Sequence, residues 1–199
     1  MPLWTVIYAV TPWSVAGFVL ALVALVAGFE VWGRRDRRTA RRVARVGWWG
    51  LLGLVLAVTV VPTEPLWSQA GSVQFVPGAG VLSLSGEGMY EPQRQAVRLT
   101  LVANALMFAP LPVLQTAGGR RNLRPWALVG QYAALSALIE LAQLAALAGR
   151  SADVDDVLCN TAGAALGVGC ALAGRWVAGR WKPRTRAGNR VRGLVRGGR

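Results

Sequence analysis

The sequence has no histidine and only two cysteines, which excludes several classes of functional site. Without histidine there can be no Ser–His or Cys–His nucleophile and no imidazole metal ligand. Cys159 and Cys170 do not form a CxxC pair. On one predicted helix they lie about 16 Å apart, beyond the reach of a disulfide bond. A disulfide scaffold and a thiolate metal site are therefore excluded as well.

Acidic residues are also scarce, nine against 22 Lys and Arg, which gives a net charge of +13. Such a balance would ordinarily suggest nucleic-acid binding. However, 19 of the basic residues fall in three segments: seven in 33–46, three in 118–125 and nine after Gly174. Orientation in a membrane and attraction to anionic lipid account for this distribution, so we expect no nucleic-acid partner.

The apolar residues, 54% of the chain, come in long and nearly uncharged runs rather than at a helical or strand period. Such runs are typical of membrane helices. They predict spans near 11–32, 46–62, 98–117, 125–148 and 157–178. The second is short for a hydrocarbon core of roughly 30 Å, so it either stands upright or is extended by residues 43–45 or by Thr63. The predicted fold is an all-α integral membrane bundle of about five transmembrane helices.

The alternation of basic and non-basic connections predicts the topology of a multi-pass protein of the cell membrane. By the positive-inside rule, 33–46 and 118–125 are cytoplasmic, whereas 63–97 and 149–156 are outside. The N-terminus is then outside and the C-terminus cytoplasmic. The first run has no basic residue before it and an Arg-rich stop after it, so we expect an uncleaved helix.

Three regions differ in composition. Residues 1–45 form an extra N-terminal helix with its basic loop, 46–178 the main membrane domain, and 179–199 a basic cytoplasmic tail that we expect to be disordered. In the outer loop, 73–76 and 81–84 flank a Pro-Gly-Ala-Gly turn signal. These segments form either a short hairpin or an irregular loop.

Polar residues at membrane depth are the candidates for function, because such groups are costly there unless they act or pair. In the fourth span Ser136, Glu140 and Gln143 follow i, i+4, i+7 spacing and form one stripe in its outer half. In the third span Asn104 lies near the outer end, and Pro110 and Pro112 should bend or break the helix.

The segment between the last two spans is the most polar of all. It contains Arg150, Asp153, Asp155, Asp156 and Asn160. Asp153 can cap the fifth helix, which places Asp156 and Asn160 on one face, followed by the small pair of a GxxxG pattern at 163 and 167. We expect this pair to pack the fifth helix against the fourth; self-association through it is a weaker reading. The three helices then form a polar, net-acidic pocket at the outer leaflet.

These residues also carry a family resemblance, in three blocks that occur in a fixed order. The blocks are NxxxFxPxG from Asn104, SxxxExxQ from Ser136, and RxxDxxDxxxNxxG from Arg150. The chain resembles the VanZ-like family over about 98–175. Pro112 stands where that family usually has glycine, and Ala152 where an aromatic residue is common. The resemblance implies a membrane protein related to one that gives low-level resistance to teicoplanin, a lipid-bearing glycopeptide.

Three functional hypotheses remain open. In the first, the pocket binds the headgroup of a membrane lipid, a lipid-linked cell-wall precursor or a lipoglycopeptide. Its ligand contacts would be Asn104, Gln143, Arg150 and Asn160. In the second, the chain is an enzyme acting on a phosphorylated or glycosylated lipid. Glu140 and Asp156 would then be catalytic, and Asp153, Asp155 and Asp156 could hold Mg²⁺ or Mn²⁺. In the third, the polar residues only join the helices.

Overall fold

The computed structural model describes residues 11–60, 73–74, 91–119, 124–146 and 152–180. Its helices are α2 (Pro12–Arg35), α3 (Arg37–Val60), α5 (Glu91–Phe108), α6 (Pro110–Ala117), α7 (Pro125–Ala146) and α8 (Val154–Arg180), with two-residue strands β1 (Val73–Gln74) and β2 (Ala152–Asp153). Five segments are long and apolar enough to span a membrane, with α5 and α6 together forming one of them. The predicted all-α membrane bundle is confirmed.

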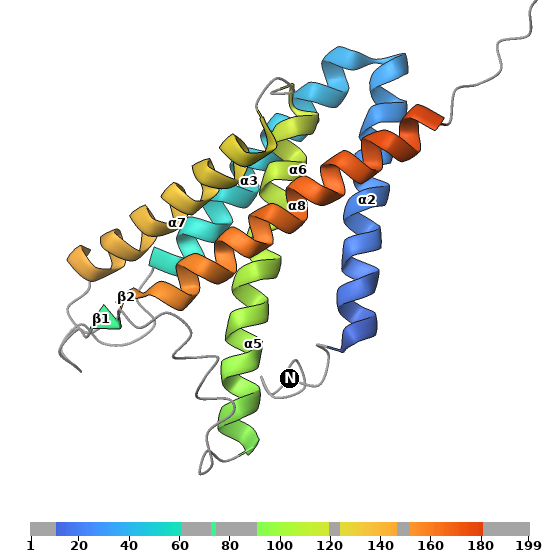
Figure 1. Cartoon of the computed structure of the whole chain (residues 1–199). Coiled ribbons are helices and arrows are strands. Elements are labelled where there is room, and N and C mark those ends of the chain that lie inside the picture. Colours follow the sequence, from blue (N-terminus) through green and yellow to red (C-terminus); the bar gives the residue numbers. More distant parts are fainter. Residues whose placement is uncertain (1–10, 61–72, 75–90, 120–123, 147–151, 181–199) are drawn as a thin grey trace, which may run out of the picture.

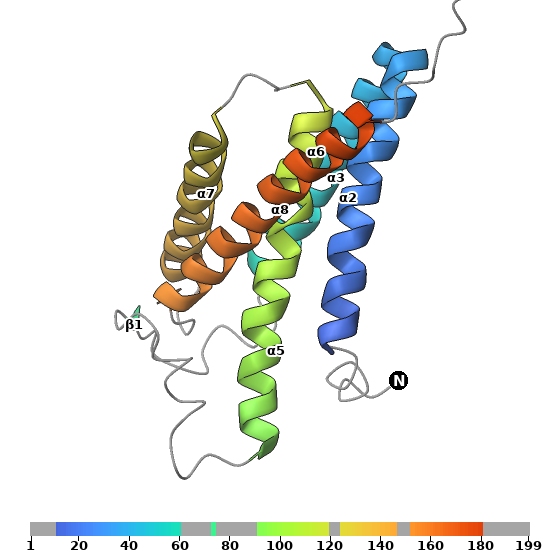
Figure 2. The same ribbon diagram turned by 45° about the vertical axis from the view of Figure 1, so that its right-hand side comes forward.

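Helix α8 is the centre of the bundle. It packs against α2, α5, α6 and α7, and it crosses the others obliquely with α7 on one side and α2 on the other (Figures 1 and 2). Two apolar clusters form the core. One, which includes Val55, Phe108 and Tyr132, joins α3, α5, α6, α7 and α8. The other, which includes Val26 and Val113, joins α2, α6 and α8.

The predicted basic loop at 33–46 is wrong, because almost all of it is helical. Helix α2 ends at Arg35 and α3 begins at Arg37, so the second span starts well before residue 46. Arginine is a good helix former, and Asp36 caps the new helix by accepting from the backbone N–H groups of Arg38 and Thr39 at 3.1 and 3.0 Å. Hydrogen bonds from the Thr39 side chain and backbone hold the pKa of the Asp36 carboxyl below its usual value.

The third span is broken at Ala109, as its two prolines predicted. Helix α5 ends at Phe108 and α6 begins at Pro110. The GxxxG pair of α8 packs on this break: a Cβ atom at Gly163 would lie 1.9 Å from the Ala105 carbonyl oxygen. The expectation that this pair packs against the fourth span is therefore wrong. Only glycine lets α8 approach the backbone of a broken helix so closely.

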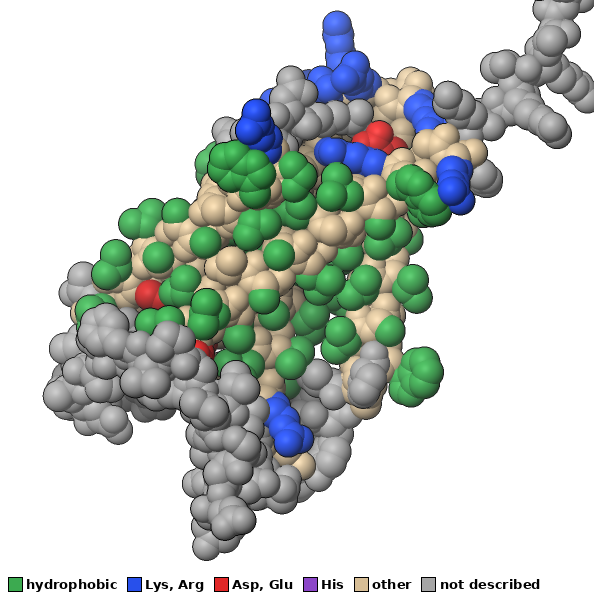
Figure 3. Space-filling view, in the orientation of Figure 1, with side chains coloured by type: hydrophobic (Ala, Val, Ile, Leu, Met, Phe, Trp, Pro, Cys, Tyr) green, Lys and Arg blue, Asp and Glu red, His purple; other side chains and the backbone are tan. Residues whose placement is uncertain are grey.

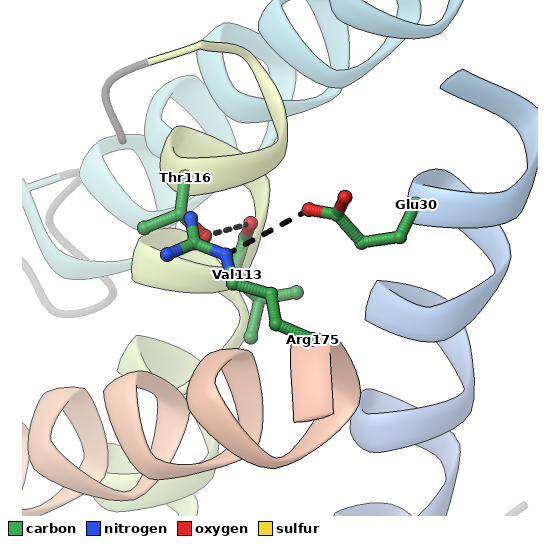
Figure 4. A network of polar contacts seen from close by, with 4 residues as sticks. All are labelled: Glu30, Val113, Thr116 and Arg175. Carbon is green, nitrogen blue, oxygen red and sulfur yellow. Dashed lines mark hydrogen bonds and ion pairs between the residues drawn. The ribbon is translucent and has the colours of Figure 1, made fainter. Parts of the chain in front are cut away.

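Helix α2 packs against α8 near the α2–α3 junction, the arginine-rich end of the bundle that is called the basic end below. A Cβ atom at Gly174 of α8 would lie 2.5 Å from the Cβ of Val26, so the helices are in close contact there. At the next residue of α8, Arg175 Nε lies 3.7 Å from a carboxylate oxygen of Glu30, which is one turn beyond Val26 in α2. Figure 4 shows the guanidinium group of Arg175 beside Val113 and Thr116 of α6, with its Nε atom joined to the carboxylate of Glu30 on α2. An ion pair at this depth avoids leaving either charge alone in an apolar environment.

The predicted hairpin can be judged only in part. Val73–Gln74 pairs in parallel with Ala152–Asp153, with Val73 opposite Ala152 and Gln74 opposite Asp153. The remaining residues of the expected hairpin lie outside the described part of the chain. The observed pairing joins the connection after α3 to the residue pair that leads into α8.

Candidate functional site

Two polar side chains meet where α8 begins beside α5. Asn104 of α5 donates from Nδ2 to Asp156 Oδ1 of α8 at 2.5 Å, and both side chains are only partly buried. The bond forms because Gly163, two turns further along α8, allows the two helices to approach. It leaves the second carboxylate oxygen of Asp156 for other contacts. This pair is the part of the predicted cluster most suited to meeting a ligand.

The first turn of α8 concentrates negative charge. Asp155 and Asp156 both lie in it, where the positive end of the helix dipole favours carboxylates. Asp153 precedes the helix and accepts from the Asp155 N–H at 2.9 Å, which confirms the predicted capping role. Asp155 is 3% exposed, so it belongs to the interior of this end rather than its surface.

Glu140 of α7 reaches the same turn from the neighbouring helix. Its Oε2 atom accepts from the Asp153 backbone N–H at 3.3 Å, and its side chain is 8% exposed. The bond ties α7 to the strand residue before α8. Since it constrains the backbone that carries Asp155 and Asp156, Glu140 positions the acidic turn.

Asn160 lies one turn deeper and points to α7. Its Nδ2 group donates to the Ser136 hydroxyl at 2.8 Å, and the Asn160 side chain is 4% exposed. Among the residues that the structure describes, the Asn160 Oδ1 atom has no hydrogen-bond partner. An unsatisfied buried acceptor is costly, so this oxygen is a place for a donor from outside the described residues.

Gln143 takes a different partner from the rest of its stripe. Its Nε2 group donates to the backbone carbonyl of Thr59 at 2.7 Å, near the end of α3. Ser136 and Glu140 therefore face α8, whereas Gln143 joins α7 to α3. The structure assigns Gln143 a joining role at the edge of the cluster.

Two sequence predictions are left without a structural test or support. Arg150 lies outside the described residues. In the described ranges, no group of three or more His, Cys, Asp or Glu side chains is arranged to hold a metal ion. The Mg²⁺ or Mn²⁺ site at Asp153, Asp155 and Asp156 therefore remains a prediction without structural support.

Two groups that accept hydrogen bonds in this cluster, the Ser136 hydroxyl and the Thr59 carbonyl, were not among the predicted site residues. Ser136 belongs to the predicted stripe, and its spacing from Glu140 signalled that it faces the same neighbour. Thr59 contributes a backbone carbonyl, which has no sequence signal. Together these contacts place the partly exposed Asn104–Asp156 pair next to a set of more deeply buried hydrogen bonds, an arrangement suited to recognising polar groups.

The three sequence blocks all fall within a region matched by a known family. The family model described as VanZ/LLP1 matches residues 48–176, about two thirds of the chain, and leaves α2 outside. No curated protein and no solved structure matches the chain. The matched region contains Asn104, Ser136, Glu140, Asp156 and Asn160, whose contacts define the cluster where α8 begins. The chain is therefore a multi-pass membrane protein that belongs to the VanZ/LLP1 family.

Proposed function

We propose that the polar cluster binds the headgroup of a lipid-linked cell-wall precursor or of a lipoglycopeptide at the outer face of the membrane. In this role the protein limits the access of teicoplanin-type antibiotics to the cell wall, or maintains the envelope. The observation that carries the proposal is the Asn104–Asp156 pair, a partly exposed carboxylate and amide at the end of three membrane helices.

The contacts divide the cluster into two groups with different roles. Glu140 and Gln143 bond to backbone groups of neighbouring segments, and Asn160 bonds to a buried hydroxyl. These bonds hold the helices in place, as the structural hypothesis requires. Asp156 and Asn104 bond to each other and are more exposed than Glu140 and Asn160, and they offer a carboxylate oxygen and an amide group suited to sugar hydroxyls, peptide amides or ammonium groups. The binding hypothesis therefore rests on this pair.

The distribution of charge supports placing the polar cluster at the outer face of the membrane. Most of the Lys and Arg side chains in view gather at the end that carries the α2–α3 junction, together with an acidic side chain, and apolar side chains cover the middle (Figure 3). Asp and Glu are also visible at the end where α8 begins, and a basic side chain is visible toward the lower end of the same view. Under the positive-inside rule the basic end is cytoplasmic, so the acidic turn faces outwards. Cell-wall precursors and glycopeptides occupy that side.

The enzymatic alternative is less well supported. Glu140 would have to exchange protons with a substrate, but its carboxylate accepts a backbone N–H and is almost fully buried. A metal-assisted reaction would need a ligand cluster, and the described residues hold none. Loss of activity in EDTA would revive this alternative.

The experiment removes the negative charge of Asp156 while keeping its hydrogen bond to Asn104. In Asp156→Asn, the new amide oxygen can still accept from Asn104, so helix packing is kept while the negative charge is lost. The wild type, this variant and Glu30→Gln, which removes a carboxylate at the opposite end, are expressed at matched membrane abundance in a susceptible Gram-positive host. Susceptibility to teicoplanin is compared with susceptibility to vancomycin, which carries no acyl chain.

We expect the wild type and Glu30→Gln to raise the inhibitory concentration of teicoplanin more than that of vancomycin, and Asp156→Asn to lose the effect. Full protection by Asp156→Asn would contradict a role for this carboxylate in binding. If the wild type protects against neither antibiotic, the resistance part of the proposal fails. Binding of a lipid-linked precursor to the purified protein then remains to be measured with the same three variants.

A further inference from the structure

A second polar site lies at the opposite, basic end of the bundle, between α3, α6 and α7. It is a cavity of about 300 Å³ lined by Arg45, Trp48, Trp49, Gln115, Gly118 and Gln131. All of the acidic residues of the cluster described above lie on or next to the other ends of α7 and α8. None of the described residues that line this cavity carries a carboxylate.

One wall of the cavity is a chain of hydrogen bonds. Trp48 Nε1 donates to the Tyr132 hydroxyl at 2.8 Å, and that hydroxyl donates to Gln115 Oε1. Gln115 Nε2 in turn donates to Gln131 Oε1 at 3.1 Å. Tyr132 and Gln115 are 0% and 6% exposed, so their rotamers are fixed by packing. Because Gln131 accepts the last of these hydrogen bonds through its Oε1 atom, its NH₂ group is the donor that this series of bonds leaves for the cavity.

The positive charge of the cavity is also held in place. Arg45 Nε donates to the backbone carbonyl of Arg41 at 3.3 Å, one turn earlier in α3. A Cβ atom at Gly118 would lie 3.0 Å from Arg45 Cγ, and one at Gly119 would lie 3.5 Å from Arg41 Nε. Gly119 has a φ of 118°, which glycine adopts without strain. The two glycines therefore leave room for two arginine stems beside the cavity.

The chemistry of the lining selects an anion that also has an apolar part. A guanidinium group and amide N–H groups are donors that suit phosphate oxygens. Trp48 and Trp49 stand edge to face at 4.7 Å, and Trp49 is 66% exposed at the surface where an indole ring meets the lipid interface. Arg45 is one of seven arginines between residues 33 and 46, a concentration of positive charge that attracts anionic lipid to this end.

We propose that this cavity binds the phosphate group of an anionic phospholipid, with the phosphate at Arg45 and Gln131 and the glycerol and upper acyl chains against Trp48 and Trp49. The site is independent of the outer cluster and of its ligand. It differs from general attraction of lipid to basic segments, because it predicts that Arg45 and Gln131, which line the cavity, matter far more for lipid binding than arginines that do not line it.

The test uses the full chain purified in neutral detergent. Native mass spectrometry measures the binding of phosphatidylglycerol, of phosphatidylcholine with the same acyl chains, and of inorganic phosphate alone. The variants are Arg45→Gln and Gln131→Leu, and the control is Arg42→Gln, an exposed arginine of the same helix that does not line the cavity. Melting temperatures without lipid show that each variant is folded.

We expect the wild type and Arg42→Gln to bind phosphatidylglycerol in preference to phosphatidylcholine. Arg45→Gln should bind it about tenfold more weakly, the effect of losing one charge-assisted hydrogen bond. Equal weakening in Arg42→Gln would overturn the proposal in favour of general surface attraction. Binding of inorganic phosphate as tight as that of the lipid would overturn the lipid assignment. Unchanged binding in both Arg45→Gln and Gln131→Leu would overturn the site itself.

Discussion

Gly167 of α8 lies directly on the carbonyl group of Ala109, so closely that a Cβ atom at this position would be 1.9 Å from the Ala109 oxygen. Ala109 is the residue at which the third span is broken between α5 and α6. Gly163 makes the same close contact with the Ala105 carbonyl oxygen, so the glycine pair brings α8 directly onto the backbone of the third span on both sides of this interruption. The glycine pair therefore belongs to the fold of a single chain.

Replacing Gly167 with alanine should be strongly destabilising. The added methyl group has no space between α8 and the Ala109 carbonyl, and forcing the helices apart should cost roughly 1–3 kcal/mol or more. Gly169→Ala is the matched control, since nothing lies within 4 Å of a Cβ atom there. Melting temperature in detergent measures both. An equal loss in the two variants would show that helix flexibility, rather than contact with Ala109, is responsible.

The Glu30–Arg175 ion pair should stabilise the contact of α2 with α8. Glu30→Gln leaves Arg175 without this carboxylate, and we expect a loss of roughly 1–2 kcal/mol, less than for a fully buried pair because both side chains are partly exposed. Adding Arg175→Gln should cost less than the same substitution does in the wild type. The double-mutant cycle is read from melting temperatures, and strictly additive losses would deny the interaction.

Tyr132→Phe removes one hydroxyl from the buried chain at the basic end while keeping the ring. Trp48 then loses an acceptor and Gln115 a donor, so we expect a loss of roughly 1–3 kcal/mol. The lipid binding proposed for the adjacent cavity should weaken too, since Gln115 no longer holds Gln131 in one position. Chemical denaturation of the purified protein gives the first value. No change in stability would mean that Trp48 Nε1 and Gln115 Oε1 find other hydrogen-bond partners of equal strength in the variant.

Ser136→Ala tests the bond between α7 and α8. The substitution removes the hydroxyl that accepts from Asn160, and bonds of this kind between membrane helices contribute about 0.6–1.7 kcal/mol. Ala134→Ser provides a comparison on an exposed position of the same helix and should be close to neutral. Thermal unfolding distinguishes the two. A loss in Ala134→Ser as large as that in Ser136→Ala would argue against a specific bond.

The predicted orientation can be tested with reporters. Alkaline phosphatase is active only outside the cytoplasm, and green fluorescent protein exported in unfolded form fluoresces only inside it. We expect fusions at the C-terminus to fluoresce and to lack phosphatase activity, whereas a phosphatase inserted in the 63–97 loop should be active. The inverse pattern would place the acidic turn of α8 in the cytoplasm and would remove the basis for an outer-leaflet ligand.

The sequence predicted the parts of this fold that depend on local pattern. Uncharged runs located the membrane helices, and the spacing of Ser136 and Glu140 placed both on the face that meets α8. The break at Ala109 followed from its flanking prolines. The start of α3 was missed because clustered arginines were assigned to a loop, although arginine is compatible with a helix that a single capping aspartate can begin.

Partners across helices could not be predicted in the same way. Asp156 meets Asn104 because α8 crosses the bundle obliquely, and the crossing angle follows from the packing of Gly163 and Gly167 on the third span. Gln143 meets the carbonyl of Thr59, a group that every residue possesses. The hydrogen bonds from Trp48 to Gln131 join residues of three different helices that belong to no sequence motif, so the sequence did not predict them.

The contact between α2 and α8 has a consequence for how the protein should be handled. The family match begins at residue 48, and a fragment cut there would be a natural choice for expression. Such a fragment would expose the face of α8 that contains Gly174 and would leave Arg175 in lipid without Glu30. We expect it to be degraded or to aggregate, so the first helix has to be kept in any preparation used to measure binding.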